Sequence, residues 1–258
     1  MLMRYPTLLP LSLIILLGLA GCASNKAREE ADRARVQLSA DGKRLIYNGK
    51  IKAATVDEAL ALYKAANPKP DTLDISSQGG SLYDGIRLGT LVYKQQLDVR
   101  IFGECASSCA NYIFPAGKRK FLLPNSRLLW HGGMLQPDWH ARIDKLYAKP
   151  DEKLAALEDH EWMLQREAAY FRMIGVDPLL TVCGQHEALR EAHPDTHGFD
   201  YTLEDLARFG VTQVQTVGRP WRPSGDDGKI FRASYCTSAP AQTQQLLKNA
   251  SKYSSEDD

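Results

Sequence analysis

The 258-residue sequence predicts one α/β domain between an N-terminal leader and a C-terminal tail. Short apolar segments typical of strands alternate with longer segments of helical period, which favours a sheet with helical crossover connections. The 237 residues that follow the leader suffice for one sizeable core. Proline, glycine and polar residues dominate after about residue 218. We therefore divide the chain into a signal peptide (1–21), a tether (22–40), one domain (41–217) and an extended tail (218–258).

The leader has the layout of a bacterial signal peptide. Arg4 precedes an almost wholly apolar run over residues 8–19, and small residues lead into Cys22. This segment resembles the lipobox of bacterial lipoproteins, which implies cleavage before Cys22 and lipidation of its thiol. Ala23 stands where an aspartate tends to retain such proteins in the inner membrane, so the resemblance implies an outer-membrane anchor that faces the periplasm. The alternative is an ordinary secretory signal with a chance cysteine.

The charge of the chain gives no reason to expect a nucleic-acid partner. Without residues 1–21 the chain carries 31 basic and 31 acidic residues, so no basic excess would attract a polyanion. No second apolar run is long enough to cross a bilayer. The membrane contact that we expect is therefore made through the N-terminal lipid alone.

Hydrophobic periodicity and turn residues predict the elements of the domain. A helix over residues 55–66 begins at a capping box of Thr55 and Glu58 and ends before Pro68. Thr202 caps a shorter helix over residues 202–209, which Gly210 ends. We expect strands over residues 45–47, 73–75, 99–103 and 126–130, and further helices over 83–95, from about 105, and over 152–173.

Three strand ends carry residues suited to catalysis. Gly79 and Gly80 follow one strand and free the backbone to direct N–H groups at a ligand. Ser107 stands at a strand-to-helix junction, where the N–H group of Ser108 is placed to stabilise an oxyanion. His131 closes a later strand, and histidine is the usual base for a serine nucleophile. Each feature also has a purely structural interpretation, respectively a turn, a helix cap and a core histidine.

Taken in order, these segments resemble the proteolytic subunit of the Clp protease and its relatives in the crotonase-like superfamily. Residues 103–107 (Gly-Glu-Cys-Ala-Ser) are similar to the segment that holds that family's nucleophile. Residues 123–127 (Leu-Pro-Asn-Ser-Arg) are similar to the segment that leads into its general base. The resemblance covers about residues 44–215 and implies an α/β fold of repeated ββα units, here with a polar tether and a tail.

The resemblance implies a serine peptidase site. Ser107 corresponds to the nucleophile and His131, which lies 24 residues later, to the general base. The backbone N–H groups of Gly80 and Ser108 fall where the family has its oxyanion hole.

Some positions depart from the family pattern. Gln78 stands in place of a proline, and Cys109 in place of a small residue. Gly198 occupies the strict position of the aspartate that orients the base. We expect Asp200 to serve as this third member, with Asp195 as a nearby alternative, because an orienting carboxylate can be shifted at a cost in rate.

Four cysteines remain after the leader, in a protein expected outside the cytoplasm, where disulfides persist. We favour the pairs Cys105–Cys109, across a strand-to-helix junction, and Cys183–Cys236, which would join the tail to the domain. Free buried thiols are the alternative. No histidine lies at ligand spacing from either pair, so no metal site is expected.

These observations favour an ATP-independent, periplasm-facing serine peptidase that acts on extended peptides or proteins. The sequence shows no segment for docking an unfolding ATPase, and it implies no cofactor. Two other functions stay open. One is a Clp-like binding module without activity, which the displaced acid supports; the other is acyl-CoA chemistry of the crotonase kind. A homo-oligomer is also open.

Overall fold

The computed structural model describes residues 35–218, 229–240 and 243. The expected signal peptide, Cys22 and most of the tether lie outside these residues, as does much of the tail. In the described part of the chain, no helix is both long enough and apolar enough to cross a membrane.

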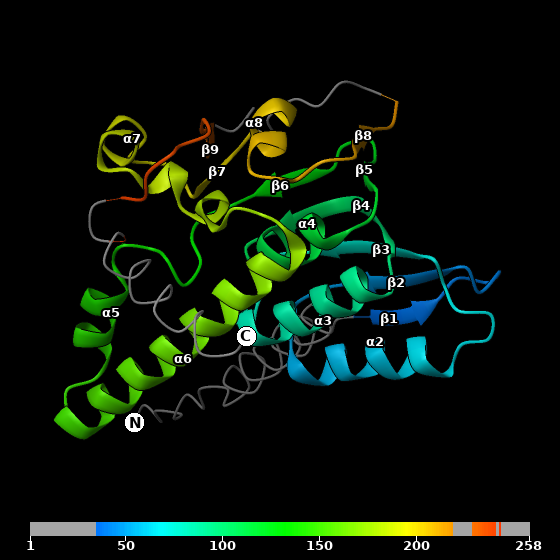
Figure 1. Cartoon of the computed structure of the whole chain (residues 1–258), viewed down its shortest axis with the longest axis horizontal. Helices are drawn as coiled ribbons and strands as arrows, with labels where there is room; N and C mark the ends of the chain where they lie inside the picture. The colour runs from blue at the N-terminus through cyan, green and yellow to red at the C-terminus, as the bar shows by residue number, and fades with distance from the viewer. Residues whose placement is uncertain (1–34, 219–228, 241–242, 244–258) are drawn as a thin grey trace, which may run out of the picture.

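A mostly parallel sheet of seven strands forms the centre of the domain (Figure 1). Its strands are β1 (Arg35–Leu38), β2 (Arg44–Asn48), β3 (Thr72–Ser77), β4 (Asp98–Ala106), β5 (Lys120–Leu122), β6 (Arg127–Leu129) and β8 (Val214–Thr216). They follow the order β1-β2-β3-β4-β5-β8, and β6 also pairs with β4. The β1–β2 pair is antiparallel, whereas the other pairs of this sheet are parallel. This sheet confirms the predicted α/β class.

Three long helices lie side by side along the sheet (Figure 1). They are α2 (Ala53–Ala65), α3 (Leu82–Lys94) and α6 (Pro150–Ile174). The apolar side chains of Val56, Leu88 and Phe171 on these helices join Leu73 and Ile75 of β3 in one buried core. The shorter helical elements are the π-helix η1 (Cys109–Ile113), α4 (Phe114–Ala116), α5 (Trp139–Leu146), η2 (Pro178–Thr181), η3 (Cys183–Gln185), α7 (Glu187–Ala192) and α8 (Leu203–Arg208).

The strand β4 changes partners along its length. Its first half pairs with β5 through Val99–Ile101, whereas its last three residues pair with β6. Its register with β3 also shifts after Ile75, as at a β-bulge. The carboxyl end of β4 is therefore directed away from β5, and β6 lies beside it at the point where the chain turns into η1.

A second, two-stranded sheet is formed by β7 (Gly198–Asp200) and β9 (Ile230–Arg232). Backbone hydrogen bonds between Trp130 and Phe199 attach this small sheet to the chain just after β6. The disulfide Cys183–Cys236, with Cα atoms 5.7 Å apart, fixes the described part of the tail to the domain as predicted. The described part of the tail is therefore packed against the domain through β9 and this disulfide.

The structure corrects several expected boundaries. The tether was expected to reach residue 40, but β1 already begins at Arg35. The helix α2 begins at Ala53, and Thr55 lies within its first turn, where its hydroxyl accepts a hydrogen bond from the Lys52 N–H group. The helix expected from about residue 105 begins later, because β4 continues to Ala106. Tertiary pairing thus extends strands that are too short to recognise by period alone.

Candidate active site

Ser107 occupies the turn between β4 and η1 in a left-handed backbone conformation. Its φ is 55°, a value that serine adopts only at a cost, so the surrounding structure must hold it there. Its N–H group donates to the Leu129 carbonyl at 2.9 Å, and its carbonyl accepts from the Asn111 N–H group at 2.8 Å. The residue is half-buried at the end of the sheet.

The turn formed by Gly79 and Gly80, called here the glycine turn, lies directly against Ser107. A Cβ atom at Gly79 would be 2.6 Å from the Cβ atom of Ser107 and 2.9 Å from the nitrogen of Ser108. Such contacts are too short for any side chain, and Gly79 also has a φ of 87°. The glycine therefore permits an approach between two backbones that the expected oxyanion hole requires.

The glycine turn presents the backbone of Gly80 to Ser108. On one side, the Gly79 carbonyl and the Ser81 N–H group both bond to Ile51. Along an extended segment successive backbone groups alternate in direction, so the N–H group and carbonyl of Gly80 face the other way. Ser108 lies on that side, where its hydroxyl donates to the Gly80 carbonyl at 2.9 Å. The N–H group of Ser108 lies at the helix start, where amides have no partner within the helix.

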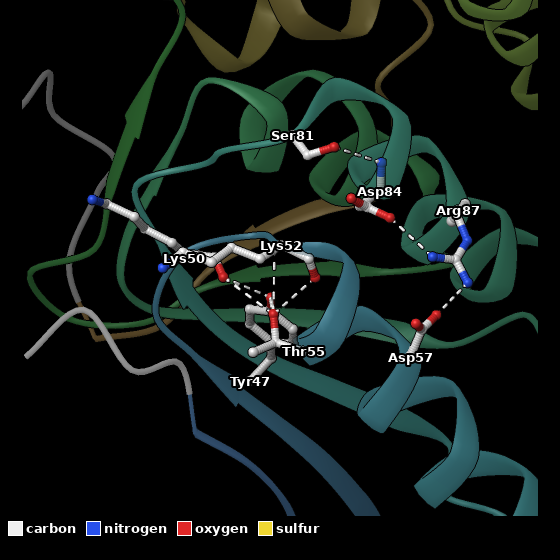
Figure 2. A network of polar contacts seen from close by, with 8 residues as sticks. All are labelled: Tyr47, Lys50, Lys52, Thr55, Asp57, Ser81, Asp84 and Arg87. Atoms are coloured by element: carbon white, nitrogen blue, oxygen red, sulfur yellow. Dashed lines mark hydrogen bonds and ion pairs between the residues drawn. The ribbon is translucent and has the colours of Figure 1, made fainter. Parts of the chain in front are cut away.

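A polar network holds the chain around Ile51, which pairs with Gly80, and the start of α3 (Figure 2). Before the turn, the hydroxyls of Tyr47 and Thr55 are 2.7 Å apart. After it, Ser81 accepts a hydrogen bond from the Asp84 N–H group at 3.2 Å, and Asp84 binds Arg87 at 2.9 Å. These contacts hold the segment that bonds to the glycine turn and the helix start that follows it.

A disulfide encloses Ser107 within five residues. Cys105 at the end of β4 and Cys109 at the start of η1 are bonded, with Cα atoms 5.2 Å apart. Both side chains are fully buried. The predicted pairing is thus confirmed, and the covalent bond closes the same short turn that carries the left-handed serine.

His131 follows β6 and lies near the end of the sheet that also carries Ser107. Because Ser107 bonds to Leu129 across the pair of β4 and β6, the two candidate residues come from adjacent parallel strands. The imidazole is exposed on one side, yet the protein around it lowers the pKa of His131 by desolvation, and the charge of Arg142 acts in the same direction. Within the described residues, no hydrogen bond joins the Ser107 hydroxyl to this imidazole.

A pocket of about 810 Å³ opens beside His131. Its walls combine the loop after His131 and α5 with α7, β7 and β9. The lining includes aromatic, basic and acidic side chains, among them Asp138, Arg190, Phe199 and Phe231. A pocket of this size next to a candidate base can accept a side chain of a bound peptide.

The structure pairs Asp200, the expected orienting acid, with Arg232 on β9, and among the described residues no contact joins Asp200 to His131. Its carboxylate is fully buried and accepts a hydrogen bond from the Arg232 side chain on β9 at 2.6 Å. Asp195, the alternative, is exposed on the loop before β7. At Gly198 a Cβ atom would lie 2.5 Å from the Trp130 carbonyl, so the strict family position has no room for an aspartate without a backbone shift.

Two further residues hold the loop that carries His131, and sequence reasoning missed both. The amide of Gln185 donates to the His131 carbonyl at 2.6 Å. The amide of Asn111, buried on η1, donates to the Gly132 carbonyl at 2.8 Å. Asn111 lies four residues after Ser107, one turn along the helix, and this position was the one available signal for it.

The arrangement brings a serine, a histidine and two outward backbone amides to one end of the sheet. These groups suit acyl transfer, in which a hydroxyl attacks a carbonyl and amides stabilise the oxyanion. Among the described residues, no group of three or more histidine, cysteine or acidic side chains is arranged to hold a metal ion. Comparison of the chain with protein-family models and with curated proteins finds no match.

Proposed function

We propose that the chain is a serine peptidase in which Ser107 is the nucleophile and His131 the general base. The observation that carries the proposal is the left-handed backbone of Ser107 at a strand-to-helix turn. Strained backbone of this kind concentrates at functional sites, and the same geometry exposes the nucleophile in other hydrolases. A helix-capping serine would need no such conformation.

In the proposed reaction the Ser107 oxygen attacks the peptide carbonyl carbon while His131 accepts the hydroxyl proton. The N–H groups of Gly80 and Ser108 stabilise the oxyanion that forms. His131 then transfers its proton to the leaving amine as the C–N bond breaks, which leaves an acyl group on Ser107. Water, deprotonated by His131, releases that group as a carboxylic acid. The hydrogen bond from Ser107 to the imidazole is expected to form when substrate binds, since catalytic hydrogen bonds often tighten only at that step.

Within the described part of the chain no acid is seen to orient His131, and this favours a slow enzyme. Asp200 is engaged with Arg232, and the charge that perturbs His131 belongs to a cation, Arg142. Loss of the orienting acid in a known triad costs about 10⁴ in rate. The same observation favours a second candidate function, a binding module that kept the fold and lost activity.

We further propose that the chain belongs with the Clp-like and crotonase-like proteins. The alternation of β2, α2, β3, α3 and β4 and the change of partner along β4 support this. The proposed substrate is an extended peptide, cleaved without ATP, with one side chain in the pocket beside His131. We propose that lipid on Cys22 holds the enzyme on the periplasmic face of the outer membrane.

A serine-reactive fluorophosphonate probe tests the peptidase function. Protein from an oxidising compartment should be labelled at Ser107, located by peptide mass spectrometry. Ser107→Ala should abolish labelling, whereas Ser108→Ala should slow it, since only the contact to the Gly80 carbonyl is lost. His131→Ala should also abolish labelling.

His140→Ala is the matched control. His140 is exposed on α5, and the substitution removes an imidazole that lies outside the proposed site. This variant should be labelled at the wild-type rate. Folded wild-type protein that stays unlabelled between about pH 5 and pH 9 would overturn the peptidase in favour of the binding module.

A further inference from the structure

The four residues from His131 to Met134 are held by side chains from several elements. Besides the amides of Gln185 and Asn111, the Trp139 side chain donates to the Gly133 carbonyl at 2.8 Å. The His160 ring lies 3.2 Å from the Met134 carbonyl, and the Met134 N–H group donates to Glu167. These contacts hold in place the loop that carries the proposed general base.

Glu167 stands out among these contacts because its carboxylate is buried. The side chain extends from α6 and is only 1% exposed. One oxygen accepts from the Tyr112 hydroxyl at 2.6 Å, and both accept from the Met134 N–H group, at 3.3 and 3.2 Å. Burying a carboxylate costs free energy unless hydrogen-bond donors compensate. We therefore look for a role of Glu167 that an apolar side chain at this position could not fill.

The two donors to Glu167 come from the two halves of the proposed site. Tyr112 lies on η1, the helix that begins just after Ser107. Met134 lies three residues after His131. Tyr112 is itself held by Tyr170, whose hydroxyl donates to the Tyr112 carbonyl. The carboxylate therefore forms a bridge between the helix of the nucleophile and the loop of the base.

We propose that Glu167 is a positioning residue that holds the loop of His131 against the helix of Ser107. The proposal rests on the proposed peptidase function. Asn111 makes a parallel contact between the same two segments, but it is uncharged and its state does not depend on pH. Glu167 is the ionisable member of the bridge, so it makes the geometry of the site sensitive to protonation.

The direction of the pH effect follows from the hydrogen bonds. Burial raises the pKa of Glu167 to about 7. The ionised carboxylate accepts from both Tyr112 and Met134, whereas the protonated acid carries a hydrogen that competes with these donors. Tyr112 is the titratable group that faces Glu167 from η1, and Tyr170 and His160 lie beside it on α6. The bridge is therefore intact above about pH 7 and weakens as the pH falls.

The pH profile of probe labelling separates this role from simple structural support. In the wild type, protonation of His131 stops labelling and protonation of Glu167 only slows it, so both protons should contribute to the fall in rate on the acidic side and the wild type should approach the rate of Glu167→Gln at low pH. Glu167→Gln cannot titrate, and its profile should have a slope of about 1. Its rate above pH 8 should be roughly 10- to 100-fold below the wild type, because the base is less well placed.

Glu158→Gln is the matched control, since Glu158 is exposed on the same helix and the chemical change is identical. It should keep the wild-type profile. Tyr112→Phe removes one donor and leaves the carboxylate, so it should lower the rate less than Glu167→Gln and keep the two-proton profile. This variant keeps the test available if Glu167→Gln does not fold. A Glu167→Gln profile identical to that of the wild type, or a Tyr112→Phe rate equal to the wild-type rate, would overturn the proposal.

Amide hydrogen exchange gives a readout that does not depend on activity. Exchange at Met134 should be faster in Glu167→Gln than in Glu158→Gln, because the amide loses its charged acceptor. If the wild type is never labelled but the Met134 amide exchanges faster in Glu167→Gln, the peptidase function is contradicted and the contact of Glu167 with the loop is still supported. Equal exchange at Met134 in the two variants would overturn the bridge itself.

Discussion

At the scale of single residues, the contact between Gly79 and Ser107 determines whether the candidate site can form. The glycine turn would supply one amide of the proposed oxyanion hole, and Ser107 is the proposed nucleophile. Gly79 cannot gain a side chain without a shift of the turn that carries Ser107, because an added Cβ atom would lie 2.6 Å from the Ser107 Cβ atom. The candidate site therefore depends on the missing side chain of Gly79 as well as on the hydroxyl of Ser107.

Gly79→Ala tests this contact. The added methyl group would lie 2.6 Å from the Ala106 carbonyl and the Ser107 Cβ atom, so the turn must move away. We expect the probe labelling rate to fall by roughly 100-fold, because displacement of a reacting group by about 1 Å can cost this much. Stability should fall by about 1–3 kcal/mol in urea unfolding.

Gly42→Ala provides the control for backbone strain. Gly42 has a φ of 71°, but a Cβ atom there meets nothing within 4 Å. It should lose about 1 kcal/mol of stability and retain wild-type labelling. Equal labelling of Gly79→Ala and Gly42→Ala would show that the glycine turn takes no part in the site.

At the scale of elements, the two disulfides differ in what they stabilise. A bridge across 53 residues restricts the unfolded chain by about 4 kcal/mol, whereas one across four residues restricts it by only about 2 kcal/mol. The larger effect belongs to Cys183–Cys236, which holds the tail. The Cys105–Cys109 bond acts mainly on local geometry, since it joins the end of β4 to the start of η1 around Ser107.

Stepwise reduction should separate the two bonds. Cys105 and Cys109 are both fully buried, while Cys236 is half-buried, so a reductant reaches the tail disulfide first. Under native conditions with mild reductant, alkylation should appear at Cys183 and Cys236 before the other pair. Mass spectrometry of the alkylated peptides measures this order. Simultaneous alkylation of all four cysteines, or the reverse order, would contradict the assignment.

At the scale of the whole molecule, the proposed attachment through Cys22 places the domain close to a membrane. The segment between Cys22 and β1 spans only residues 23–34. Even a fully extended chain of this length reaches about 40 Å, which is of the order of the domain's own size. An anchored domain would therefore stay near the membrane surface and act on substrates that come to it.

Lipidation is tested by metabolic labelling with a clickable fatty-acid analogue. The wild type should incorporate the label, and Cys22→Ser should remain an unlabelled precursor of higher apparent mass, because the thiol is the acceptor. Ser24→Ala, two residues further along, should be labelled as the wild type is. Equal incorporation in Cys22→Ser and the wild type would rule out this anchor.

Much of the architecture was predictable because local patterns encode it. The strands β2 and β3 and the helices α3 and α6 were placed within a few residues by their apolar periods. The short strands β5, β7, β8 and β9 were missed, since three residues carry no period and are strands only through their partners. The buried Glu167 left a weak signal, a carboxylate between Leu164 and Phe171 on the apolar face of its helix.

The sequence by itself determined the α/β class and the strand ends where Ser107 and His131 stand, because these features depend on neighbouring residues in the chain. It favoured the two disulfide pairs, and the structure confirmed them, Cys183–Cys236 across 53 residues. Only the tertiary structure decided which distant groups meet. It paired Asp200 with Arg232, 32 residues away, and connected Tyr112 to Glu167 across 55 residues. The reason is physical: a buried charge is placed where donors satisfy it, and those donors are brought together by the packing of whole elements.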